Sequence, residues 1–379
     1  MKKSVKILFL CLAVILSFAL LVACSNGETT PNDNDTQDVT EGYREVIDLE
    51  GNTVTVPENI ESIVVTSWKG AFESLVLLNR TDLLVSMCDT TRYNWLMQAM
   101  PELQEIPDYG NFDEVNIEEL LKADADVIIS PTEAPEANKK MRELGMPVYV
   151  DGAVDSSLPA LESSTVELMA VAELIGETEK ANEYLQWRQD ILDLVSERVA
   201  DIPEEERKVA LAINAGINNV WNNTYTVGAC IELAGGINAA ADMFEGTYYG
   251  ELSAEEIIAI DPDFMFQNTS VRQYGEELKG YFLELQADER YNSITAVQNG
   301  DAYIMPRGLS NWNGDTELGL GVITMAKIMY PDRFADIDVW ELAQDFYSTF
   351  VGIEITEEDW LLMHPHDFDG AKPLEVYHD

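Results

Sequence analysis

Aromatic and arginine side chains gather in the polar segments that directly follow short apolar runs of this 379-residue chain. Aromatic faces bind flat or bulky molecules, and a guanidinium pairs with carboxylate or phosphate groups. These side chains lie among Asn, Thr, Gly and Ser, without the periodicity of a core helix, where aromatic residues are otherwise expected. The sequence therefore predicts a ligand-binding surface formed by Trp68, Arg92, Tyr93, Trp95, Trp221, Tyr225, Tyr248, Tyr249, Arg307 and Trp312.

Arg92 and Arg307 leave two interpretations open, because each can meet an anionic group of a ligand or form a surface ion pair. The histidines give little sign of a metal site. His364, His366 and His378 all fall in the last 16 residues. They can bind metal if this tail folds over the ligand surface, but a solvated tail explains them equally simply. We expect no metal and no resident cofactor.

One pattern occurs twice. Residues 118–129 read EELLKADADVII and residues 255–266 read EEIIAIDPDFMF, a separation of 137 residues. Each copy predicts a short helix, a tight turn and a buried strand, with Asn116 or Ser253 as the N-cap. A separation this long exceeds the unit of a repeat array. It indicates two similar α/β lobes.

The surrounding pattern of strands and helices predicts a parallel sheet in each lobe. Ligands bind at the carboxyl ends of such strands, which can face each other across a cleft between two lobes. A long helical stretch between them predicts a rigid connecting helix, which Gly176 can divide into two. The expected parts are an N-terminal lobe at 43–157, a connecting helix at 158–200, and a C-terminal lobe with its tail at 201–379.

The N-terminus has the form of a secretory signal. Three lysines precede the apolar run 7–22, and Cys24 follows directly. An uncleaved membrane anchor is the alternative, although the run is short for a span. Residues 1–23 are the expected signal peptide and residues 24–42 an acidic flexible tether. Cleavage takes three lysines and no acid, so the formal net charge moves from −46 to −49. This charge argues against nucleic acid or an anionic surface as a partner.

The order of several motifs resembles the substrate-binding lipoproteins of ABC transporters for iron–siderophores, haem and cobalamin (class III periplasmic binding proteins). The resemblance covers most of residues 43–350. It rests on the lipobox, VIDLEGNTVTVPENIESIVV, VNIEELLKADADVIIS, LGMPVYV, LAGGINAA, ELSAEEIIAIDPDFMF, ITAVQNGDAYIMP and MYPDRF. It implies that Cys24 is acylated, that one rigid helix joins the lobes, and that the ligand lies between them.

The resemblance also gives the repeated glutamates a role. In this family one exposed glutamate on each lobe docks to the permease, in motifs that match Glu118 and Glu255 here. The alternative is ordinary acidic charge at a helix N-terminus. Glu119 and Glu256 share that alternative without the motif match.

The resemblance implies an extracytoplasmic, lipid-anchored binding protein that delivers a metal chelate to an ABC permease and its ATPase. A ferric siderophore is the first expectation, with haem or a corrinoid also open. A surface-anchored ligand sensor is an alternative, and a hydrolase that uses only carboxylates is another. No enzyme is expected, because both lobes lack a histidine and a Gly-x-Ser-x-Gly elbow. Cys88 and Cys230 fall in different expected lobes, which favours two buried free thiols over a disulfide.

Overall fold

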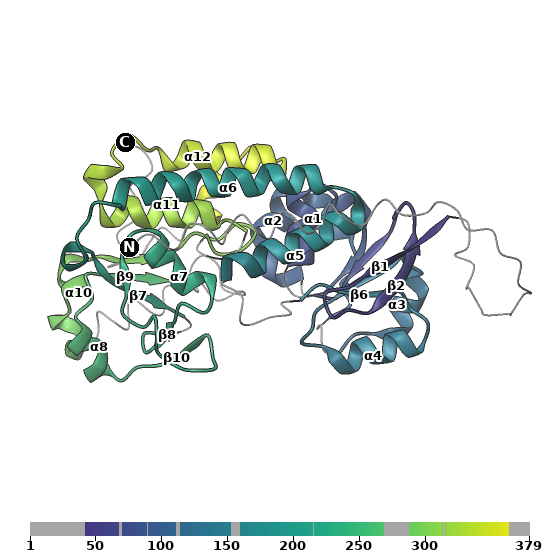
Figure 1. Cartoon of the computed structure of the whole chain (residues 1–379), viewed down its shortest axis with the longest axis horizontal. Coiled ribbons are helices and arrows are strands. Elements are labelled where there is room, and N and C mark those ends of the chain that lie inside the picture. The colour runs from purple at the N-terminus through teal and green to yellow at the C-terminus, as the bar shows by residue number, and fades with distance from the viewer. Residues whose placement is uncertain are drawn as a thin grey trace, which may run out of the picture. The chain divides into compact units, whose positions relative to one another are not determined.

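The N-terminal lobe is organised around a four-stranded parallel sheet with the order β4-β3-β5-β6 (Figure 1). The computed structural model describes residues 42–67, 70–88, 90–110, 114–152, 160–214, 216–268, 288–312, 314 and 316–363. Almost every residue of the four strands is buried, as expected for a parallel sheet covered on both faces. The strands are β3 (Ile63–Val65), β4 (Leu84–Met87), β5 (Val127–Ser130) and β6 (Val148–Val150).

A β-hairpin precedes this sheet, as the alternating sequence predicts. Strands β1 (Tyr43–Ile47) and β2 (Thr53–Pro57) pair antiparallel, and Val54 and Val56 point into the core. Gly51 adopts a φ of +84° in the turn, a conformation that favours glycine. The helices of this lobe are α1 (Ala71–Leu77), α2 (Asn94–Ala99), α3 (Ile117–Ala123) and α4 (Pro135–Glu143).

The C-terminal lobe has a mixed sheet with the order β10-β8-β7-β11-β12, and β9 also pairs with β7. Strands β7, β9, β11 and β12 are parallel, as predicted, whereas β8 and β10 run antiparallel at one edge. The segment 215–225, predicted as a loop, therefore contains a strand. The strands are β7 (Val209–Ile213), β8 (Asn219–Trp221), β9 (Ile237–Asn238), β10 (Tyr249–Glu251), β11 (Phe264–Gln267) and β12 (Ala302–Ile304).

Helices cover this sheet and complete the lobe. Five of them keep close to the expected segments, and a π-helical turn, Tyr347–Val351, extends one of these, α12. No helix of the described ranges is long and apolar enough to span a membrane. The helices are α7 (Thr226–Leu233), α8 (Ala254–Ile260), α10 (Thr295–Asn299), α11 (Leu318–Met329), α12 (Val339–Phe346) and α13 (Glu357–Met363).

The connecting stretch divides at Gly176, which has a φ of +78°. Helix α5 (Ala160–Ile175) precedes this glycine and α6 (Thr178–Val199) follows it. Arg188 of α6 donates to Ser164 Oγ (3.1 Å) and Thr165 Oγ1 (2.6 Å) of α5, so the two helices lie antiparallel. Helix α6 also packs along α11 of the C-terminal lobe (Figure 1). The connection is thus a packed pair of helices.

Both copies of the repeated pattern fold as a helix, a left-handed turn and a buried strand. Asp124 and Asp261 end the two helices with φ values of 45° and 48°. Asp126 Oδ2 accepts from the backbone N–H of Ser62 at 3.0 Å, just before β3. Asp263 Oδ2 accepts from the N–H of Val209 at 3.0 Å, at the start of β7. The repeated aspartates therefore fix the first strand of each sheet beside its neighbour.

Candidate functional site

The ten residues predicted to bind ligand fall into three groups in the structure. Trp68 lies outside the described residues, and Arg92 lies in a 3₁₀ turn in which only its backbone is described. A second group is enclosed by the protein: Tyr93, Trp95, Arg307 and Trp312. The third group is at least partly open to solvent and lies together at the edge of the C-terminal sheet: Trp221, Tyr225, Tyr248 and Tyr249.

The enclosed tryptophans use their indole N–H groups inside the protein. Trp95 donates to Asp359 Oδ1 at 3.1 Å, which joins α2 to α13. Trp312 donates to the hydroxyl of Tyr347 at 3.0 Å. Both side chains have no exposed surface, because the turn after α12 and the start of α13 cover them. At these positions the two rings hold the fold together.

Tyr93 and Arg307 are enclosed for similar reasons. The Tyr93 ring packs on Phe72 with centroids 4.5 Å apart, and its hydroxyl donates to Glu73 at 3.5 Å. Arg307 is 5% exposed, and its backbone N–H donates to the carbonyl of Met363 at 2.9 Å. The end of α13 thus closes over the loop that follows β12.

The open group forms a continuous row of rings, which we call the aromatic cluster (Trp221, Tyr225, Tyr248 and Tyr249). Trp221 and Tyr249 face each other across β8 and β10, with centroids 5.3 Å apart. Trp221 also contacts Tyr225 at 5.4 Å, and Tyr225 contacts Tyr248 at 5.9 Å. Tyr248 and Tyr249 are 48% and 43% exposed. Exposed aromatic surface that is gathered in one place is typical of a binding site.

Two buried asparagines hold the aromatic cluster together. Asn222 donates through Nδ2 to the carbonyls of Met243 and Thr247, both at 2.8 Å, and its own N–H donates to Tyr248 O. Asn238 donates to the carbonyl of Trp221 at 3.1 Å. The sequence analysis missed both residues. The run of asparagines at 218, 219, 222 and 223, interleaved with Trp221, is the signal that could have identified Asn222.

Two polar atoms beside the aromatic cluster have no hydrogen-bond partner among the described residues. They are the buried indole Nε1 of Trp221 and the buried Oδ1 of Asn219. Leaving such an atom unpaired costs about 1–3 kcal/mol. The two residues lie on one face of β8, opposite Tyr249 and Glu251 of β10. This face therefore offers rings, a hydrogen-bond donor and an acceptor together.

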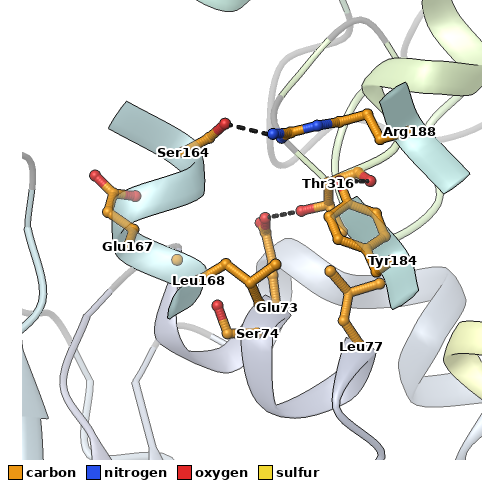
Figure 2. Close-up of a pocket in the computed structure, with 10 residues that line it drawn as sticks. Glu73, Ser74, Leu77, Ser164, Glu167, Leu168, Tyr184, Arg188 and Thr316 are labelled. Carbon is orange, nitrogen blue, oxygen red and sulfur yellow. Dashed lines mark hydrogen bonds between the residues drawn. The ribbon is translucent and has the colours of Figure 1, made fainter. Parts of the chain in front are cut away.

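A separate pocket lies between α1, α5 and α6 (Figure 2). Glu73 of α1 points towards Thr316, which donates to its carboxylate at 2.5 Å (Figure 2). The hydroxyl of Tyr184 donates to the carbonyl of the same threonine at 2.9 Å. Opposite them, Arg188 points towards Ser164. These bonds link the N-terminal lobe to the loop that precedes α11.

Two buried carboxyl groups near this pocket have raised pKa values. Burial raises the pKa of Glu317 to about 8, and the charge of Glu73 adds to the shift. Glu317 accepts from the N–H groups of Leu309 (2.6 Å) and Ser310 (2.9 Å). Burial also raises the pKa of Asp151. These contacts give the pair a role in fixing loops.

The described residues contain no group of three or more His, Cys, Asp or Glu side chains placed to hold a metal ion. The tail that carries His364, His366 and His378 lies outside those residues, as does Cys24. Cys88 and Cys230 are both free and buried, which confirms the prediction made for them.

Glu118 and Glu255 are exposed in the first turns of α3 and α8. Neither side chain forms a hydrogen bond or an ion pair with another described residue. Their neighbours act locally, because Glu119 pairs with Lys122 at 2.6 Å and Glu256 completes the capping box that begins α8. Of each acidic pair, the first member is therefore the one available to a partner.

Comparison with known proteins gives a consistent result. A family model described as "Periplasmic binding protein" matches residues 63–308. The chain is 23% identical to the molybdate-binding protein MolA of Haemophilus influenzae, over 81% of this chain and 90% of that protein. It is 26% identical to a cobalamin-binding protein of Halobacterium salinarum, over 42% of each. A periplasmic solute binding protein from Veillonella parvula superposes with a TM-score of 0.70 at 21% identity, covering 85% of this chain and 97% of that one.

Proposed function

The chain belongs to the periplasmic binding protein family, whose members work with ABC transporters outside the cytoplasm, and we propose that it delivers a metal chelate to an ABC importer. The family match confirms the resemblance seen in the motifs, and the structural neighbours confirm the two-lobe α/β fold. These relatives are solute-binding proteins rather than enzymes.

The aromatic cluster is the observation that carries the choice of ligand. Four rings in contact, two of them almost half exposed, form an apolar wall suited to a bulky or planar molecule. A ferric siderophore fits this wall, and haem or a corrinoid would fit it for the same reason. The rings would face the ligand from the C-terminal lobe, and Trp68 and Arg92 would face it from the N-terminal lobe.

Molybdate, which the Haemophilus influenzae relative binds according to its name, is the second candidate. A compact oxyanion needs several N–H donors or cations around it. At the aromatic cluster the described residues supply one unpartnered donor, the indole N–H of Trp221, beside an unpartnered acceptor on Asn219. This composition favours a larger ligand that brings both donors and acceptors.

Titration of tryptophan fluorescence tests this proposal. We expect a ferric siderophore, haem or cobalamin to quench the emission at micromolar concentration, and we expect molybdate to leave it unchanged. Trp221→Phe should remove much of the quenching, whereas Trp187→Phe, a change within α6, should not. A response to molybdate alone would replace the chelate with the oxyanion.

We also propose that Glu118 and Glu255 dock to the permease. Both carboxylates are exposed and unpaired among the described residues, while Glu119 and Glu256 are engaged locally. Two such charges on separate lobes can set the orientation of the protein on a two-fold symmetric partner. A charge-based contact of this kind weakens with salt.

Membrane attachment through lipid on Cys24 is the remaining part of the proposal, and it rests on the sequence. A tethered receptor stays near its importer at high effective concentration. A sensor that presents the ligand to a membrane kinase would use the same anchor and the same ligand site. Uptake of a labelled chelate that depends on the chain would support transport, whereas an unchanged uptake with altered signalling would support the sensor.

A further inference from the structure

The segment that carries the aromatic cluster contains no basic residue. Between Lys208 and Arg272 the sequence has eight acidic residues and neither lysine, arginine nor histidine. The electrostatic potential at this edge of the C-terminal sheet is therefore set by carboxylates. An anionic ligand would meet repulsion here, whereas a cationic one would be attracted.

The rings themselves favour positive charge. Aromatic faces carry negative electrostatic potential and bind organic cations, most strongly when several rings are present. The cation–ring contacts of the described residues occur elsewhere, where Arg188, Arg198 and Arg290 lie over their own partner rings. No described guanidinium or ammonium lies over Trp221 or Tyr249.

Hydrogen-bond acceptors border the same rings. Glu251 stands opposite Asn219 in the pairing of β10 with β8, next to the pair formed by Trp221 and Tyr249. The Glu251 side chain is exposed and forms no ion pair with a described residue, and Asn219 Oδ1 is buried without a partner. A carboxylate and an unpaired carbonyl oxygen beside aromatic faces suit an ammonium group that donates hydrogen bonds.

We infer that the ligand held at the aromatic cluster carries a positive charge, such as the pendant ammonium group of a ferric hydroxamate chelate. The inference rests on the proposed function for the chelate itself, but the charge preference stands on Trp221, Tyr249, Asn219 and Glu251. The ammonium group lies against the rings and donates to Asn219 Oδ1 and Glu251. The indole N–H of Trp221 donates to an oxygen of the chelate.

A matched pair of chelates tests the charge directly. Ferrioxamine B has a pendant ammonium group, and its N-acetyl derivative keeps the same ferric core without that charge. We expect ferrioxamine B to bind at least about tenfold more tightly than the acetylated form. Glu251→Gln should reduce this ratio, whereas Glu232→Gln, which removes an exposed carboxylate of α7, should leave it unchanged. Equal affinities, or tighter binding of an anionic ferric tris-catecholate, would overturn the inference.

A second pair separates this inference from the proposed function. Choline and its uncharged isostere 3,3-dimethyl-1-butanol differ in charge but contain no metal. If no chelate binds while choline quenches Trp221 and the isostere does not, the chelate proposal fails and the charge preference holds. If chelates bind without regard to charge and choline matches its isostere, the proposed function stands and the charge preference is wrong.

Discussion

Trp221 and Tyr249 meet nearly edge to face across β8 and β10, with ring centroids 5.3 Å apart and an interplanar angle of 69°. The indole N–H of Trp221 is buried there without a hydrogen-bond partner among the described residues. An unpaired donor beside exposed aromatic surface is costly to keep unless a ligand uses it. This pair is the structural basis for placing the ligand at the edge of the C-terminal sheet.

Replacing Trp221 should separate its ring from its N–H group. Trp221→Phe keeps an aromatic face and removes the donor, so we expect the affinity for the bound chelate to fall about five- to tenfold. Trp221→Ala removes both and should cost more than about tenfold. Isothermal titration calorimetry measures these changes. Equal affinities of Trp221→Phe, Trp221→Ala and the parent would remove Trp221 from the site.

Asn222 should matter for the order of the segment that carries Tyr248. Asn222→Ala removes two hydrogen bonds to the carbonyls of Met243 and Thr247 and leaves both without a donor. We expect faster amide exchange across residues 243–249, and a loss of about 1–3 kcal/mol in the free energy of unfolding. Asn182→Ala, on the exposed face of α6, is the matched control. Unchanged exchange at 243–249 would show that the segment is held by other contacts.

Neutralising both proposed docking residues should abolish transport without affecting ligand capture. We expect Glu118→Gln with Glu255→Gln to lower uptake of a labelled chelate at least about tenfold, while the Kd of the isolated protein stays the same. The control replaces Glu179 and Glu232, exposed glutamates of α6 and α7, with glutamine. Normal uptake by the first double variant would disprove the docking assignment.

Glu317 predicts the direction in which stability changes with pH. Its pKa in the folded protein is about 8, above the ordinary value of 4.5, so the folded state holds this proton more tightly than the unfolded state. The stabilisation is complete below the ordinary pKa and is lost as the pH rises towards about 8. We expect denaturant unfolding to show a larger loss of stability between about pH 5 and about pH 8.5 for the parent than for Glu317→Gln. The same loss in both proteins would contradict this assignment.

Cys24→Ser should release the protein from the membrane. Without the thiol no lipid can be attached, and the mature chain has no other proposed anchor. Fractionation with immunodetection should move the variant from the membrane to the soluble extracytoplasmic fraction. Retention in the membrane would favour the uncleaved-anchor interpretation of residues 1–23.

Local patterns predicted the architecture well. The two copies of the repeated motif form matching units because their signals lie within a few residues: N-caps at Asn116 and Ser253, and left-handed aspartates that end each helix. The packing of the connecting helices was left open by the sequence, because Gly176 permits either one helix or two. The antiparallel pair depends on the contact of Arg188 with α5, more than 20 residues away.

The candidate site was predicted less completely. Trp95 and Trp312 lie in polar segments that resemble surface loops, but their enclosing partners come from the turn after α12 and the start of α13. Such long-range burial has no local signature. Trp221, Tyr225, Tyr248 and Tyr249 were predicted individually, while their contact required β8 and β10, each only three residues long. Short strands with polar residues lack the alternation that identifies longer ones.

The identity of the molecule that the protein carries when purified from its native source tests the central claim most directly. Native mass spectrometry gives the mass of the bound ligand, and elemental analysis gives its metal. We predict one metal chelate per chain, bound in contact with Trp221 and lost in Trp221→Ala. Bound molybdate, or a metal-free ligand that Trp221→Ala retains, would contradict the account.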